Sequence, residues 1–94
     1  MVGVSEALLS AAKNYLDITW SEAGGDAKLT DILRRGMRYM EQAAGTPLDF
    51  DTADKPQELL FEYARYVRNN ALQYFAQDFQ GELRMLQWRA NYGA

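Results

Sequence analysis

The chain of 94 residues contains no cysteine and no histidine. Disulfide bridges and thiolate metal sites are therefore excluded, and so are the commonest metal ligand and the side chain that titrates near neutral pH. Its thirteen acidic residues offer no evident pair of a general acid and a general base. We expect no enzyme activity, no metal and no cofactor. An enzyme that relies on carboxylates alone is the weakest hypothesis.

Long apolar runs are also missing, since no stretch approaches the roughly 20 residues that a membrane-spanning helix needs. The first four residues lack a basic region followed by an apolar one, which a secretory signal would require. We therefore expect no membrane contact and a cytosolic origin. The apolar share of 48% is ordinary for a folded chain, and this length supports one hydrophobic core.

Basic residues are fewer than acidic ones: the chain has ten basic and thirteen acidic residues, and its net charge is −3. A negative net charge disfavours a protein that binds the phosphates of nucleic acid. One basic cluster exists at Arg34, Arg35 and Arg38, although Asp31 and Glu41 are close enough on a helix to neutralise much of it. A small DNA-binding packaging or regulatory module that uses these arginines is the alternative hypothesis for function.

Apolar residues recur at helical spacing in three segments, which are 5–16, 26–44 and 56–79. Ser5, Asp26 and Asp54 are suitable N-caps for the first, second and third helices, and Gly45 is a suitable end for the second. Gly36 lies within the apolar stripe of the second helix, where the lack of a side chain lets another helix approach closely. The fold predicted is all-α: a small bundle of three to four helices, with two long antiparallel helices and an extended C-terminal tail.

The linker at 46–55 carries three aspartates, at positions 49, 51 and 54. Their spacing does not match a calcium-binding loop, which also needs a central glycine and a distal glutamate. We expect these aspartates to form turns and cap the next helix. Leu48 and Phe50 are expected to hold the linker on the core.

The third helix is apolar over more than half of its circumference. One stripe suits packing on the second helix, and the residues beside that stripe are predicted to contact another subunit. They are Phe61, Arg65, Arg68, Leu72 and Phe79 on one shoulder, and Leu59 and Tyr66 on the other. Aromatic residues and arginine are enriched at protein interfaces. The alternative is that the first helix and the linker cover these positions within the same chain.

The last residues change from helical to alternating spacing, which is typical of a strand. We predict a bundle domain at 1–82 and a partner-binding tail at 83–94. The tail residues predicted to bind a partner are Leu86, Trp88, Arg89 and Tyr92. An extended segment can add to the sheet edge of a partner. The alternative is that the tail folds back on its own helices or forms a short fourth helix.

Several segments together resemble the head–tail connector (adaptor) proteins of tailed bacteriophages. They are the sequence from Tyr15 to Trp20, the amphipathic helix that ends at Ala44 and Gly45, the stretch Leu48–Asp49–Phe50, Glu58–Leu59–Leu60, and the run from Tyr63 to Asn70 followed by Phe75 and Phe79. The resemblance covers about residues 5–80, and the run from Tyr63 to Asn70 is its strongest part.

The resemblance implies a structural subunit with no catalytic residues. Such subunits form a cyclic ring that joins the portal protein to tail or stopper proteins, and DNA passes through the channel without specific binding. The implied location is the head–tail interface of the virion, after assembly in the host cytoplasm. Acidic channel walls would repel phosphate and let the genome slide.

Overall fold

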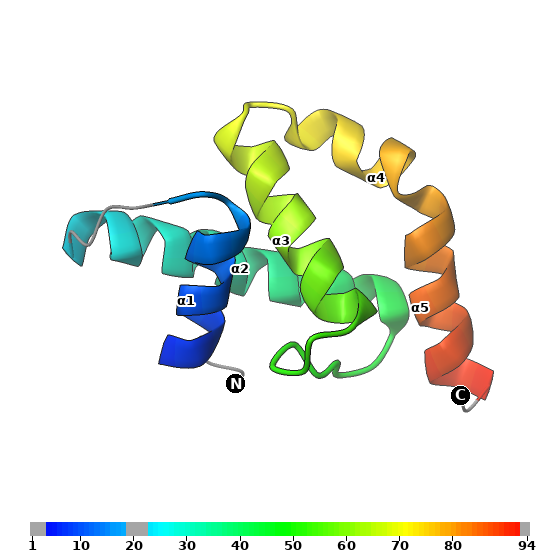
Figure 1. The fold of residues 1–94 in the computed structure, drawn as a ribbon. Helices are drawn as coiled ribbons and strands as arrows, with labels where there is room; N and C mark the ends of the chain where they lie inside the picture. The colour runs from blue at the N-terminus through cyan, green and yellow to red at the C-terminus, as the bar shows by residue number, and fades with distance from the viewer. Residues whose placement is uncertain (1–3, 19–22, 93–94) are drawn as a thin grey trace.

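The computed structural model describes the backbone of residues 4–18 and 23–92, and the side chains in these ranges except those at positions 23 and 89–92. Within this part every regular element is helical, which confirms the all-α class (Figure 1). The elements are α1 (Glu6–Tyr15), α2 (Ala23–Ala44), α3 (Lys55–Arg68), the 3₁₀ turn η1 (Leu72–Tyr74), α4 (Phe75–Asp78) and α5 (Gln80–Tyr92). None of the described helices is both long enough and apolar enough to cross a membrane.

The predicted caps at Ser5, Asp54 and Gly45 are confirmed. The predicted cap at Asp26 is wrong, because α2 begins at Ala23 and Asp26 lies within its first turn. The Ser5 hydroxyl accepts a hydrogen bond from the backbone N–H of Leu8, and the Asp54 carboxylate accepts one from the N–H of Lys55. These bonds satisfy N–H groups that have no partner inside a helix. Gly45 follows α2 with φ of 78°, a conformation that glycine adopts without steric cost. Local sequence therefore determines where these three helices begin or end.

The third helix stops at Arg68, so the prediction that it continues to Phe79 is wrong. Asn70 adopts φ of 56° and its N–H donates to the carbonyl of Val67, while the N–H of Ala71 donates to the carbonyl of Tyr66. This pair of bonds is the Schellman motif, in which a left-handed residue closes a helix. Asparagine enters this conformation more readily than most residues. The chain then turns through η1 and α4 (Figure 1).

The core is centred on the contact between α2 and α3, which cross each other with α1 and α5 to either side (Figure 1). Gly36 sits at this crossing: a Cβ atom there would lie 2.7 Å from Cδ1 of Leu60 and 2.8 Å from Cδ1 of Tyr63. The predicted close approach at Gly36 is confirmed. Phe50 is buried in the same core and Leu48 packs against it, so the linker is held as predicted.

The C-terminal segment is helical as far as Tyr92, so the predicted extended conformation is wrong there and the helical alternative is the one that the structure adopts. Leu83 and Leu86 are spaced one helical turn apart, and both pack on the core. Glu, Leu, Arg, Met and Gln are all good helix formers, which outweighs the alternating pattern. Residues 83–94 were predicted to be a separate tail, but in the described part of it α5 contacts α2 and Leu86 belongs to the same core as the other helices.

Candidate interaction surface

Two of the predicted interface residues lie in the core. Leu59 is 1% exposed and Phe61 is 3% exposed. The ring of Tyr15 in α1 packs on Phe61 with a centroid distance of 5.2 Å. The prediction of subunit contacts through Leu59 and Phe61 is therefore wrong, since neither has surface left for a second subunit. Coverage by the first helix was the alternative, and it holds for Phe61.

The other predicted residues gather where α3 ends and the chain turns into η1 and α4. Arg65, Arg68 and Leu72 are exposed, while Tyr66 and Phe79 are half-buried. Tyr66 packs edge to face on the buried ring of Phe75 with a centroid distance of 5.6 Å, and Phe79 packs on it at a tilt with a centroid distance of 5.0 Å. The hydroxyl of Tyr66 donates to Asp78 at 2.7 Å, and this bond raises the pKa of Tyr66. The turn is thus a fixed platform that presents its outer side chains.

Arg65 lies at the centre of this surface. Its guanidinium stacks over the ring of Tyr15 at 5.2 Å from the centroid, and one of its nitrogens lies 3.6 Å from Glu62. Two hollows of about 360 Å³ each adjoin it, and both are lined by Arg65 and Asn69. One extends to Tyr15 and Arg68, and the other to Tyr74. The arginine therefore separates two shallow hollows.

Tyr15 is held by more than its ring contacts. Its hydroxyl donates a hydrogen bond to the carboxylate of Glu62. Partial burial, this bond and the negative charge of Glu62 raise the pKa of Tyr15 to about 12. The hydroxyl therefore stays protonated at physiological pH and ties α1 to α3.

The residues predicted for the tail divide into different groups. Leu86 is buried, which excludes it from partner binding, and the side chains of Arg89 and Tyr92 lie outside the described residues. Trp88 is 57% exposed and remains a candidate. Beside it, Met85 is 55% exposed, a residue that sequence reasoning missed. The helical spacing of Met85 and Trp88, three residues apart, could have indicated it.

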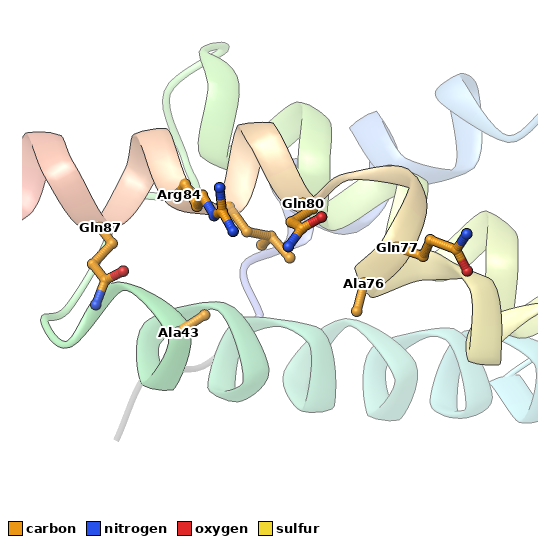
Figure 2. A pocket seen from close by; sticks show the side chains of 7 residues that line it. Ala43, Ala76, Gln77, Gln80, Arg84 and Gln87 are labelled. Atoms are coloured by element: carbon orange, nitrogen blue, oxygen red, sulfur yellow. The ribbon is translucent and has the colours of Figure 1, made fainter.

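A groove of about 460 Å³ runs between the C-terminal end of α2 and the segment from α4 to α5 (Figure 2). Its lining is mostly amide and small side chains: Ala43, Ala76, Gln77, Gln80, Leu83, Arg84 and Gln87. Such a lining offers hydrogen-bonding groups without a catalytic constellation.

The aspartates of the linker act in the predicted manner. Asp49 accepts hydrogen bonds from the hydroxyl of Thr52 and from the N–H of Asp51, and these two bonds lower the pKa of Asp49. Asp51 accepts from the hydroxyl of Ser5 at 3.0 Å, and Asp54 caps α3. Among the described residues, no three acidic side chains come close enough together to hold a metal ion.

Arg34, Arg35 and Arg38 are all exposed on α2. Nε of Arg35 donates to Asp31 at 3.0 Å, so the predicted pairing with Asp31 is confirmed for this arginine. Comparisons of the chain with protein-family models, with curated proteins and with solved structures find no match. Function is therefore inferred from the residues of this chain and from their arrangement.

Proposed function

We propose that the chain is a structural head–tail connector subunit of a tailed phage, which assembles with copies of itself into a ring between the portal and the tail or stopper proteins. The ring lies at the head–tail interface of the virion and lines part of the DNA channel. The chain catalyses no reaction in this role.

The observation that carries this proposal is the presence of large apolar side chains exposed on two different elements. Leu72 and Tyr74 are 42% and 55% exposed on the turn after α3, and Met85 and Trp88 are exposed on α5. Exposed apolar side chains that gather in this way mark contact sites. A ring subunit touches two neighbours through different surfaces, as well as partners above and below. Two separate surfaces on one small chain suit this requirement.

The resemblance noted in the sequence supports the choice of a phage connector over other assemblies. Its strongest part, from Tyr63 to Asn70, includes Arg65, Tyr66, Arg68 and Asn69, which lie on or beside the exposed turn. Arg65, Asn69 and Asn70 of this run are exposed, whereas Tyr63 and Ala64 fill the core.

Electron microscopy of the purified chain tests the proposal, alone and mixed with the portal ring of the virus that encodes it. We expect rings, either free or attached to one face of the portal. A variant with Leu72→Ser and Tyr74→Ser should lose the rings while keeping its helical circular dichroism. If the unaltered chain stays monomeric both alone and with the portal, the proposal is wrong.

A further inference from the structure

The exposed face of α2 is a stripe of positive charge. Lys28, Arg34, Arg35 and Arg38 lie within about a third of the helix circumference, at roughly 100° per residue, with Asp31 as the acidic member. Leu33 and Met37 lie on the opposite face and are buried. The stripe is therefore directed away from the core.

The charges of this stripe are only partly neutralised within the chain. Asp31 pairs with Arg35. Arg34 and Arg38 have no ion pair with any described residue. Two exposed guanidinium groups on one helical face thus remain available to an acidic partner.

The linker between α2 and α3 carries the opposite charge. Asp49, Asp51 and Asp54 are exposed, and their hydrogen bonds come from backbone N–H groups and hydroxyls. No cation among the described residues forms an ion pair with them. The local bonds of Asp49 and Asp54 hold the loop in one conformation. In Figure 1 the loop lies at the lower edge of the molecule, below the start of α3.

We propose that the arginine stripe of α2 binds the acidic linker of a second copy of this chain. The contact rests on the proposed ring function and adds a charged pair of surfaces to the apolar ones through which neighbouring subunits meet. Each surface repels a copy of itself, which disfavours a two-fold contact centred on either one. Pairing unlike surfaces instead gives the head-to-tail contact that a closed ring requires.

Charge also favours this occupant over nucleic acid. The chain as a whole carries a net charge of −3, and Asp31 lies inside the stripe. Only two unpaired arginines would therefore attract a phosphate backbone, and the remaining charge of the chain would repel it. A second copy brings three aspartates on a loop of defined shape. The basic stripe and the acidic linker are then both present on every copy of the chain.

Reciprocal charge reversal tests the contact. The first variant, Arg34→Glu with Arg38→Glu, makes the stripe acidic. The second, Asp51→Lys with Ala53→Lys, makes the linker basic and keeps Asp49 in the linker turn and Asp54 as the cap of α3. We expect each variant alone to assemble at least about tenfold more weakly than the unaltered chain. An equimolar mixture should recover assembly, because each reversed surface then meets an opposite one.

Sedimentation velocity at about 0.05 M and about 1 M NaCl measures the association, in samples with and without the portal ring. The unaltered chain should assemble more weakly at high salt. As a control, Ser10→Glu adds a negative charge to an exposed position of α1, outside the stripe, the linker and the groove, and should leave assembly unchanged. Circular dichroism confirms that each variant is folded.

The possible failures are distinct. If the unaltered chain forms rings that neither charge reversal weakens, this contact is wrong while the ring function stands. If the unaltered chain forms no assembly alone or with the portal, both the ring function and this contact are wrong. If Arg38→Glu abolishes binding to a short DNA duplex at low salt without weakening self-association, the stripe is a nucleic-acid site and the contact is also wrong.

Discussion

At the scale of single residues, Tyr15 gives the fold a dependence on alkaline pH. Its folded pKa of about 12 lies above the ordinary value of 10.0, because of partial burial first and then the hydrogen bond to Glu62, so the protonated hydroxyl stabilises the fold fully below pH 10. This stabilisation is lost as the pH rises through the folded pKa. We expect Tyr15→Phe to lower the free energy of unfolding at neutral pH and to reduce its decline between about pH 10 and 12. Urea unfolding over this pH range measures the free energy of unfolding. If it declines as steeply in Tyr15→Phe as in the unaltered chain, the raised pKa of Tyr15 is contradicted.

Gly36 is the residue whose size matters most at the crossing of α2 and α3. Alanine would improve helix propensity by about 1 kcal/mol, but its Cβ would lie within 3 Å of Leu60 and Tyr63. Overpacking a core costs about 1–3 kcal/mol, so we expect Gly36→Ala to lower the free energy of unfolding by about 1 kcal/mol. Gly81→Ala is the matched control, since nothing lies within 4 Å of a Cβ at Gly81. Chemical denaturation should find the control neutral or stabilised, and a stabilised Gly36→Ala would contradict the close packing.

At the scale of elements, Asn70 decides where α3 ends. Its φ of 56° is accessible to glycine without strain, but costs other residues about 1–2 kcal/mol and β-branched residues the most. We therefore expect Asn70→Gly to leave stability unchanged or raised, and Asn70→Val to lower the free energy of unfolding by about 1–2 kcal/mol. Equal stability of the two variants in urea unfolding would mean that the left-handed turn does not terminate α3.

The helices that could be predicted from the sequence are those set by short-range rules. Ser5, Asp54 and Gly45 satisfy backbone groups within their own turns, so their roles needed no knowledge of the rest of the chain. The end of α3 was missed because the apolar spacing continues through Phe75 and Phe79. The signal was present in the two successive asparagines, of which Asn70 takes the left-handed conformation.

Prediction of the candidate surface failed for a different reason. A helical pattern gives the direction of a side chain but not the element that covers it. Phe61 lies on the predicted shoulder, yet α1 folds back over it and Tyr15 packs on its ring. Leu72 lies past the end of α3 and stays exposed as predicted. Arg65 also stays exposed, although its guanidinium stacks on Tyr15 of α1.

At the scale of the whole molecule, α5 is an integral part of the single core and not an appendage. A domain of this size is stable by only about 5–15 kcal/mol, so the loss of one helix that buries Leu86 is a large fraction of the total. We expect a chain truncated after Gly81 to lose cooperative thermal unfolding. If the truncated chain keeps the melting temperature of the full chain and the helical circular dichroism of its remaining helices, α5 is not an integral part of the core.

Single substitutions on α5 separate its part in the core from its part in partner binding. Leu86→Ala removes a buried side chain that is 4% exposed, so it should lower the free energy of unfolding by about 2–5 kcal/mol. Met85→Ala changes an adjacent side chain that is 55% exposed, and should alter stability by less than about 0.5 kcal/mol. Urea unfolding compares the two. If Met85→Ala weakens attachment to the portal ring at unchanged stability, α5 both completes the core with its inner face and binds a partner with its outer face. If Met85→Ala is instead as destabilising as Leu86→Ala, the outer face of α5 is not a free surface.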